Sequence, residues 1–315
     1  MNRTFLLLLA GACIVVAAAP LPAQTAAAPF TVQENGEGYG SLADAVAAIG
    51  GGNGTIVIAP GTYRQCAVQN AGRIAYVASA PGTVVFDGVA CEGKGALVLD
   101  GAGAEVRGLI FQNIRVADGN GAGIRLESGD LNVAESLFRD GENGILVAND
   151  HHGTIRVDHT TFSGLGGCPE DGGCSHSIYN SGNGALIVTS SRFERGTGGH
   201  YVKSRGPRIE VVDSSFDDSQ GRATNYMIDL SNGATGTIAR NVFVQGEDKE
   251  NYSAFISVAP EGRDNASTGL AVTDNEAGLA PGVQRRTSFV ADASGQRLNI
   301  ANNRLDPQIA SLERR

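Results

Sequence analysis

A repeating pattern of residue types constrains the fold of this 315-residue chain more than any other feature of its sequence. Five segments, 131–138, 155–162, 186–193, 209–216 and 238–243, end on a phenylalanine that lies five residues after an aliphatic residue. The aliphatic column extends beyond them and comprises Val106, Val133, Val157, Val188, Val211, Ile238, Val272 and Ile300. A spacing of this kind is typical of proteins in which each repeat stacks on the next.

Two further columns accompany the aliphatic one. Small polar residues recur two positions before the aromatic column, at Ser136, Thr160, Ser191, Ser214, Asn241, Asn275 and Asn303. Such side chains bond to the backbone at bends, so we expect a ladder of them at one corner of each repeat. A second short segment follows in each repeat and alternates apolar with polar residues, as a strand with one buried face does.

The columns resemble those of the right-handed parallel β-helix, the pectate-lyase-like superfamily, over residues 30–306. Residues 41–49 have a capping box and an apolar stripe, and they precede a strand-like segment at 55–63. Many β-helix proteins have a similar opening, which covers the end of the coil.

We therefore predict an all-β fold, a single-stranded right-handed parallel β-helix (solenoid) with a short N-terminal capping helix. The repeats would span roughly residues 55–306, within one domain of residues 24–315, because no linker interrupts the pattern. The 44 glycines and the absence of tryptophan suit the tight turns of such a coil.

The first 23 residues have the pattern of a Sec signal peptide, with a basic start at Arg3, an apolar core and a cleavage site before Gln24. The apolar run is too short for a transmembrane span and ends at Pro20. Cys13 follows a segment that weakly resembles a lipoprotein signal, but we do not expect a lipoprotein. The protein is predicted to be secreted or periplasmic.

Four cysteines would remain after export: Cys66, Cys91, Cys168 and Cys174. An even number in an oxidising compartment indicates two disulfide bonds. Cys66 and Cys91 lie on adjacent repeats and are expected to pair, and Cys168 with Cys174 would staple the loop between them. Free thiols are the alternative, and the spacing is weak evidence for a zinc site.

The charge of the chain indicates what it binds. A formal net charge of −9 disfavours nonspecific binding to nucleic acid or to an anionic membrane. Nevertheless, one stretch of seventeen residues contains Arg192, Arg195, His200, Lys203, Arg205 and Arg208. A cationic cluster on an acidic protein indicates an anionic ligand.

Aligning the repeats predicts which side chains share a face. If Val202 points inward, then Tyr201, Lys203 and Arg205 point outward together. The column of Lys203 also contains Arg125, Tyr179 and Asp229. A neighbouring column contains Asn143, His176, His200 and Tyr226. Strict alternation would turn this last column inward, whereas a bend before the strand would turn it outward.

Such a cluster suits β-elimination on an acidic, uronate-containing polysaccharide, which requires a cation at the carboxylate, a base and an acid. Lys203 is the candidate base, and Arg205 would bind the carboxylate as a bidentate pair. Tyr179 or His200 would supply the proton. Candidate substrate-binding residues are Tyr201, His176, Tyr226, Asp229 and Arg125.

The resemblance also bears on cofactors, because several β-helix polysaccharide lyases combine a Lys or Arg base with calcium. Calcium is therefore a candidate cofactor, with Glu170, Asp171 and Asp229 as ligands, although no compact run of acidic ligands is visible. No other cofactor is indicated. The long intervals 162–193 and 243–277 would form walls of a groove.

A noncatalytic β-helix that binds an acidic glycan, or has a structural role in the envelope, is the alternative to a lyase. Lys203 would then simply pair with Asp229 across neighbouring strands. A hydrolase of the polygalacturonase type is disfavoured, because Asp217 and Asp218 follow Gly199-His200 in the reverse of that family's order. In each case the expected partner is an acidic polysaccharide, and we expect a monomer.

Overall fold

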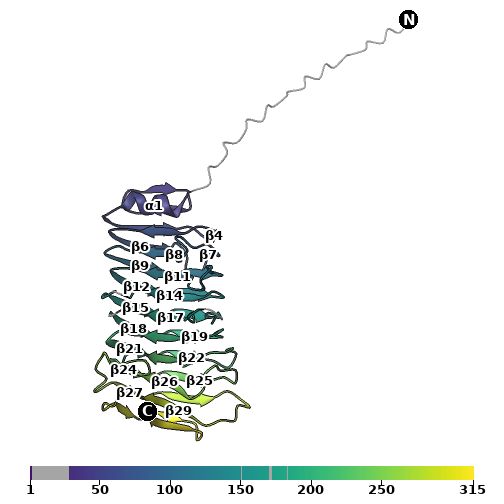
Figure 1. The fold of residues 1–315 in the computed structure, drawn as a ribbon. Coiled ribbons are helices and arrows are strands. Elements are labelled where there is room, and N and C mark those ends of the chain that lie inside the picture. Colours follow the sequence, from purple (N-terminus) through teal and green to yellow (C-terminus); the bar gives the residue numbers. More distant parts are fainter. Residues whose placement is uncertain (2–27, 150, 170–171, 183) are drawn as a thin grey trace.

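The computed structural model describes Met1 and residues 28–149, 151–169, 172–182 and 184–315. Apart from Met1, the predicted signal peptide lies outside the described residues. The described part is a stack of coils with helix α1 (Leu42–Ile49) at one end and the C-terminus at the other (Figure 1). None of its helices has the length and apolar character that crossing a membrane would require.

Three sheets, A, B and C, run along the stack. Sheet A contains β2 (Glu37–Tyr39), β1 (Phe30–Val32), β3 (Asn53–Ile58), β6 (Arg73–Ala78), β9 (Gly103–Arg107), β12 (Asp130–Ala134), β15 (Thr154–Asp158), β18 (Ala185–Thr189), β21 (Arg208–Val212), β24 (Thr235–Ala239), β27 (Ala271–Thr273) and β30 (Asn299–Ala301). Sheet B contains β4 (Gly61–Tyr63), β7 (Val84–Asp87), β10 (Leu109–Gln112), β13 (Leu137–Arg139), β16 (Thr161–Ser163), β19 (Arg192–Glu194), β22 (Ser215–Asp217), β25 (Val242–Gln245), β28 (Glu276–Leu279) and β31 (Arg304–Leu305). Sheet C contains β5 (Ala67–Gln69), β8 (Gly95–Leu99), β11 (Ala122–Leu126), β14 (Asn143–Val147), β17 (Ile178–Asn180), β20 (Val202–Ser204), β23 (Ile228–Leu230), β26 (Ala254–Val258), β29 (Thr287–Asp292) and β32 (Ile309–Arg314).

Each coil contributes one strand to each sheet in chain order, beginning with β3, β4 and β5 and ending with β30, β31 and β32. Strands of neighbouring coils pair in parallel, whereas β1 pairs antiparallel with β2 and β3. The register keeps like residues together: Val133 is opposite Val157, and Phe138 is opposite Phe162. The predicted all-β parallel β-helix is therefore confirmed.

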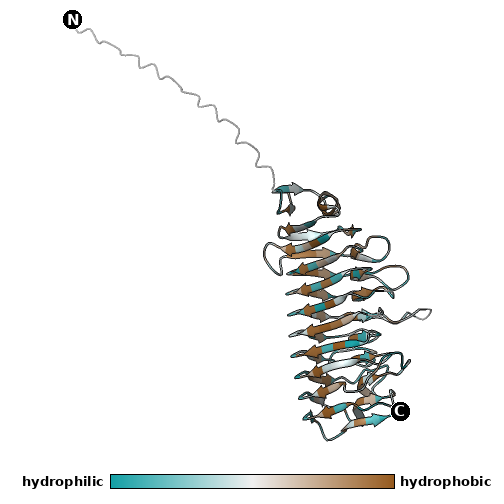
Figure 2. Ribbon diagram, turned by 90° about the vertical axis from the view of Figure 1, so that its left-hand side faces the viewer, coloured by the Kyte–Doolittle hydropathy of each residue, from teal (hydrophilic) through white to brown (hydrophobic). Residues whose placement is uncertain are grey.

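The interior contains a stack of phenylalanine rings from sheet B. Successive ring centroids are 4.7 to 5.6 Å apart along Phe86, Phe111, Phe138, Phe162, Phe193, Phe216 and Phe243. Apolar positions recur from strand to strand down the coil (Figure 2). Each buried ring stabilises the fold by roughly 1.5–3 kcal/mol through removal of its surface from water.

The predicted polar ladder lies at the corner between sheets A and B. The residue before each ladder position turns the chain with a positive φ, as Asp213 does at 53°. The amide of Ser214 donates to Oδ1 of Asn241 (2.9 Å), and the amide of Asn241 donates to Oδ1 of Asn275 (3.0 Å). The side chains of Ser136, Ser191, Ser214, Asn241, Asn275 and Asn303 each accept a hydrogen bond from a backbone amide of the preceding coil, at a corner that has no strand partner for that amide.

Helix α1 begins and packs as its sequence predicts. The hydroxyl of Ser41 accepts a hydrogen bond from the amide of Asp44 (3.1 Å), which satisfies one of the free donors of the first turn. The apolar stripe is buried, at Leu42, Ala45 and Val46. These side chains belong to the same core as the first coils, so the helix closes that end of the interior.

Both predicted disulfide bonds are present. Cys66 bonds to Cys91, with 5.5 Å between their Cα atoms. Cys168 bonds to Cys174, with 4.1 Å between their Cα atoms. The first bond joins neighbouring coils, and the second closes a short loop between sheets B and C.

Two consecutive residues point inward where the chain enters sheet C. Tyr201 and Val202 are 2% and 0% exposed. Tyr201 packs edge-on against Phe193 and Phe216, and its hydroxyl donates to Oδ1 of Asp218 (2.7 Å). The prediction that Tyr201 points outward and binds a substrate is therefore wrong, because alternation begins only at Val202, after a bend.

The column of Tyr201 changes in size along the stack. From the N-terminal to the C-terminal coils it reads Ala96, Gly123, Gly144, Ser177, Tyr201, Met227, Phe255 and Phe289. A Cβ atom at Gly144 would lie 2.7 Å from the ring of Phe162. Gly123 and Gly144 are therefore required where a ring from sheet B reaches this wall, whereas the coil before them has room for the methyl group of Ala96.

Candidate functional site

The candidate site lies on the outer face of sheet C, at strands β17, β20 and β23. Tyr179, Lys203 and Asp229 are opposite one another in register, as the sequence predicted. Two rows of loops border this face, those that lead from sheet B into sheet C and those that lead from sheet C into sheet A.

Lys203 is buried between two carboxylates. Its Nζ lies 3.5 Å from Oδ2 of Asp229 and 2.5 Å from Oε1 of Glu261. The ammonium also lies 5.7 Å from the centre of the Tyr179 ring. The side chains of Lys203 and Asp229 are only 11% and 2% exposed, whereas that of Glu261 is 40% exposed. Glu261 therefore stands on the solvent side of the ion pair.

Arg205 is fixed by three neighbours. Its Nε donates to the hydroxyl of Tyr179 (2.9 Å), its Nη1 donates to Oδ1 of Asn232 (2.8 Å), and its Nη2 pairs with Oε2 of Glu261. One carboxylate thus bridges Lys203 and Arg205, with one oxygen on each cation.

A row of rings borders the Lys203 column. The amide of His176 donates to Oδ1 of Asn143 (2.8 Å), and the amide of His200 donates to Nδ1 of His176 (2.9 Å). The ring centre of His200 lies 5.0 Å from that of His176 and 5.9 Å from that of Tyr226. Because Tyr201 and Val202 both point inward, the bend turns this row outward, and Nε2 of His200 lies 3.7 Å from Oδ2 of Asp229.

The histidines of this row are neutral at pH 7. Burial, with the charges of Lys203 and Arg205 added, lowers the pKa of His176 to about 3. Burial likewise lowers the pKa of His200 well below 6.5, and the charges of its neighbours act in the same direction. Each neutral ring therefore has one unprotonated nitrogen, whose lone pair can accept a hydrogen bond or a proton.

The two carboxylates at Lys203 are shifted in opposite directions. Burial raises the pKa of Asp229, and the ammonium of Lys203 opposes this only in part. Partial burial would also raise the pKa of Glu261, but its contacts with Lys203 and Arg205 outweigh burial and lower it. Oδ1 of Asp229 is buried and has no hydrogen-bond partner among the described residues.

The structure separates some residues that the sequence grouped. Of the six basic residues in the cationic stretch, Arg192 and Arg208 lie on sheets B and A, and Arg195 faces Asp140. Arg125 lies in the predicted column, two strands above Tyr179, and pairs with Glu127 (3.2 Å). The hydroxyl of Tyr226, at the edge of the site, accepts from Asn251 and Arg315.

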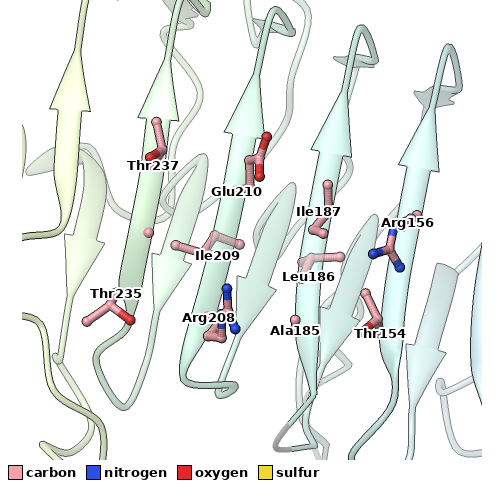
Figure 3. A pocket seen from close by; sticks show the side chains of 11 residues that line it. Thr154, Arg156, Ala185, Leu186, Ile187, Arg208, Ile209, Glu210, Thr235 and Thr237 are labelled. Carbon is pink, nitrogen blue, oxygen red and sulfur yellow. The ribbon is translucent and has the colours of Figure 1, made fainter.

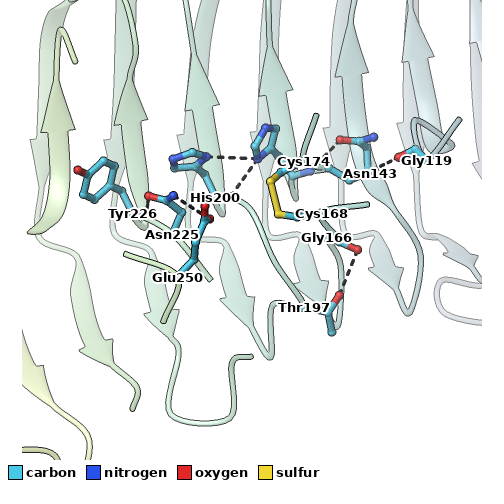
Figure 4. The surroundings of a disulfide bond; sticks show 12 residues. Gly119, Asn143, Gly166, Cys168, Cys174, Thr197, His200, Asn225, Tyr226 and Glu250 are labelled. Carbon is cyan, nitrogen blue, oxygen red and sulfur yellow. Dashed lines mark hydrogen bonds between the residues drawn. A yellow bond between two sulfur atoms is a disulfide. The ribbon is translucent and has the colours of Figure 1, made fainter. Parts of the chain in front are cut away.

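The disulfide loop forms part of the border beside the histidine row. Figure 4 shows the Cys168–Cys174 bond near His200, Asn225 and Glu250. The sulfur atoms lie within 4.8 Å of a carboxylate oxygen of Glu250, but they are bonded to each other and offer no thiolate to a metal. Glu170 and Asp171, the predicted calcium ligands, lie outside the described residues, and Asp229 contacts Lys203.

Two cavities extend the same face of sheet C in both directions. One of about 490 Å³ includes Val68 and Val98, which stand in the column of Lys203 nearer the N-terminus. The other, of about 740 Å³, includes Ser288 and Glu313 on the C-terminal coils. A further cavity of about 630 Å³ lies on sheet A, where Arg156, Arg208 and Glu210 line it (Figure 3), and it is separate from the site.

Sequence reasoning missed Glu261 and Asn232, which complete the environment of Arg205. Glu261 lies in the long interval 243–277, whose loops were expected to form a wall. The length of the interval signalled a loop here, but the path of that loop determines which of its acidic residues reaches Lys203.

No protein-family model and no curated protein matches this chain. Among solved structures it is similar to the PL6 family alginate lyase AlyGC, with 13% identity and a TM-score of 0.46, over 80% of this chain and 36% of that one. It is also similar to ORF18 of Geobacillus virus E2, with 13% identity and a TM-score of 0.45, over 86% of this chain and 57% of that one. The chain thus spans less than two thirds of either structure. Likenesses of this strength say nothing about its activity. The structure itself provides the parallel β-helix and the candidate site on sheet C.

Proposed function

We propose that this protein is an exported, polysaccharide lyase-like enzyme that acts on an acidic, uronate-containing polysaccharide by β-elimination. One observation carries the proposal: two cations, a neutral imidazole and a tyrosine hydroxyl meet on one face of the coil. The cavity toward the C-terminal coils, which Arg286 and Arg315 help to line, would accommodate further acidic sugars. The two disulfides are compatible with a secreted or periplasmic location.

The cations would bind the uronate carboxylate. Arg205 and Lys203 already share one carboxylate, that of Glu261. A uronate in the same position would have its charge neutralised, which makes the proton on the adjacent carbon easier to remove. In this role Lys203 acts as a cation, and the role of base passes to another group.

His200 is the proposed base. Its lowered pKa leaves the ring neutral, with a lone pair for the proton of the carbon beside the carboxylate, but also makes it a weaker base than a free histidine. Asp229, 3.7 Å from Nε2, would stabilise the imidazolium that forms. From the sequence, Lys203 was expected to be the base and Tyr179 or His200 to be the acid. In this proposal His200 is the base instead.

Tyr179 is the proposed acid. Its hydroxyl accepts a hydrogen bond from Nε of Arg205, which leaves its own proton free to be donated. As the carbon loses its proton to His200, the electron pair forms the carbon–carbon double bond and the glycosidic bond to oxygen breaks. That oxygen would take the proton of Tyr179.

The test is incubation of the protein with alginate, pectate, glycosaminoglycans and bacterial exopolysaccharides while the ultraviolet absorbance of a new double bond is followed. We expect one polymer to be cleaved, and we expect His200→Gln and Tyr179→Phe to lower kcat by about 10²- to 10⁴-fold. His152→Gln, at an exposed position, is the matched control. No absorbance change with any polymer would refute the lyase.

Noncatalytic binding of an acidic glycan is the second candidate, because the charges of Lys203 and Arg205 are already paired within the protein. Under this alternative no polymer is cleaved. Arg205→Ala would nevertheless weaken binding to an acidic polysaccharide in an affinity gel.

A further inference from the structure

Glu261 occupies the place that the proposed function gives to a substrate carboxylate. Oε1 lies 2.5 Å from Nζ of Lys203, and Oε2 pairs with Nη2 of Arg205. A ligand carboxylate that contacted both cations would need the same two positions. Glu261 and such a ligand therefore exclude each other.

The two cations stay in place without Glu261. Arg205 retains its hydrogen bonds to Tyr179 and Asn232, and Lys203 retains Asp229 at 3.5 Å. A cation pair that other groups hold is preorganised for an incoming carboxylate, which reduces the ordering cost of binding.

The loop that carries Glu261 is held by backbone hydrogen bonds, whereas its side chain is held by the two cations. The amides of Glu261 and Gly262 donate to the carbonyl of Ser231 (3.0 and 3.1 Å). Nδ2 of Asn265 donates to the carbonyls of Arg205 and Gly233 (2.8 and 3.0 Å). The Glu261 side chain is 40% exposed, so it can rotate toward solvent while the loop stays in place.

A ligand that displaces Glu261 needs a negative charge of its own, because two cations must be paired again. When a uronate replaces Glu261, one carboxylate is exchanged for another and both cations remain paired. A neutral sugar in the same place would leave Lys203 and Arg205 without their shared partner in a partly desolvated site, which is costly. Glu261 therefore competes with every ligand for the two cations, and a neutral sugar does not repay the loss of that pairing.

We propose that Glu261 is a specificity-determining residue, an internal competitor that only a carboxylate-bearing ligand displaces. This inference rests on the proposed function, because it takes the uronate site to lie between Lys203 and Arg205. It adds that the unliganded site is closed, and that the substrate class is defined by a carboxylate that places one oxygen on each cation.

The test compares Glu261→Gln and Glu261→Ala with the wild type by isothermal titration calorimetry. The ligands are short oligomers of alginate and of pectate, and neutral cello-oligomers of equal length. Loss of the competitor should tighten uronate binding by about tenfold, the factor that corresponds to one charge-assisted hydrogen bond. The neutral oligomers leave both cations unpaired and should remain the weaker ligands in the wild type and in both variants. Glu250→Gln is the matched control, because Glu250 contacts Asn225 and neither cation.

A second measurement needs no ligand. Glu261 covers Lys203, so Glu261→Ala should increase the rate at which an amine-acylating reagent labels Lys203, as followed by peptide mass spectrometry. Unchanged labelling, or uronate affinity that is unchanged or weaker in both variants, overturns the inference. If the variants bind uronate oligomers more tightly but cleave none of them, the inference stands and the lyase is refuted.

Discussion

His176 belongs both to a hydrogen-bond ladder of the fold and to the candidate site. Its Nδ1 accepts the amide of His200, as Oδ1 of Asn143 accepts the amide of His176 one coil earlier. An imidazole thus takes the place of an amide in a ladder. Because Nδ1 must stay unprotonated to accept this bond, the ladder is sensitive to acid.

A pH dependence of stability follows from this burial. The pKa of His176 is about 3 in the fold and 6.5 for an ordinary histidine, so between these values the unfolded chain binds a proton that the folded protein does not. Stability therefore falls as pH drops below about 6.5, by up to about 1.4 kcal/mol per pH unit from this residue.

The measurement is urea unfolding at pH 7, 6 and 5. His176→Asn keeps a hydrogen-bond acceptor and should have a smaller loss of stability than the wild type over this range. His152→Asn, at an exposed position, should leave the loss unchanged. A His176→Asn protein with the same pH dependence as the wild type would show that this histidine is not the cause.

At the same scale, the sequence predicted the neighbours of Lys203 better than the orientation of Tyr201. Strand alternation and the repeat fix the register, so Tyr179 and Asp229 were aligned with Lys203 correctly. The orientation of Tyr201 was predicted wrongly, because the bend turns its side chain inward together with that of Val202. Glu261 was missed because loop geometry, unlike strand register, has no period in the sequence.

Among the elements, the loops that lead into sheet C are joined by a buried ion pair. Oδ2 of Asp218 lies 3.1 Å from Nζ of Lys249, and these side chains are 0% and 1% exposed. Asp218 also accepts hydrogen bonds from Tyr201 and Thr224, and Lys249 donates to the carbonyl of Asn225 (2.5 Å). Three successive loops therefore depend on one carboxylate.

Removal of that carboxylate should be costly. Asp218→Asn leaves the Lys249 ammonium buried without its counter-ion, and we expect a loss of about 3–5 kcal/mol in guanidinium unfolding. The double variant Asp218→Asn with Lys249→Met removes the stranded charge and should recover most of that loss. If the double variant is no more stable than the single one, the hydrogen bonds of Asp218 matter more than the charge pair.

The whole molecule is stabilised by repeated contacts between neighbouring coils, and the disulfides add to them unequally. Cys66 and Cys91 are separated by 25 residues, and Cys168 and Cys174 by 6. In the chain-entropy model the longer loop gains about 3.5 kcal/mol and the shorter one about 2 kcal/mol. Thermal unfolding of the two Cys→Ser double variants should therefore show the larger loss for Cys66 and Cys91, and the reverse order would contradict the entropic account.

The fold could be predicted at this scale because each coil repeats the same constraints. The Phe138 and Phe162 positions, the aliphatic column and the polar ladder each recur often enough to be recognised without a structure. The candidate site has no such redundancy. Arg205, His200 and Glu261 each occur once at their positions. The repeat predicts the coils that carry them but not these side chains.

The column of Tyr201 widens from Gly123 and Gly144 to Phe255 and Phe289, and this limits where a coil can stand in the stack. Gly144 faces a ring that leaves no room for a Cβ atom, whereas the same place farther along the stack holds a full aromatic side chain. A coil moved from one end to the other would meet either a clash or a void. Coils with glycine at this position and coils with an aromatic residue there therefore cannot exchange places, although their strands follow the same repeat.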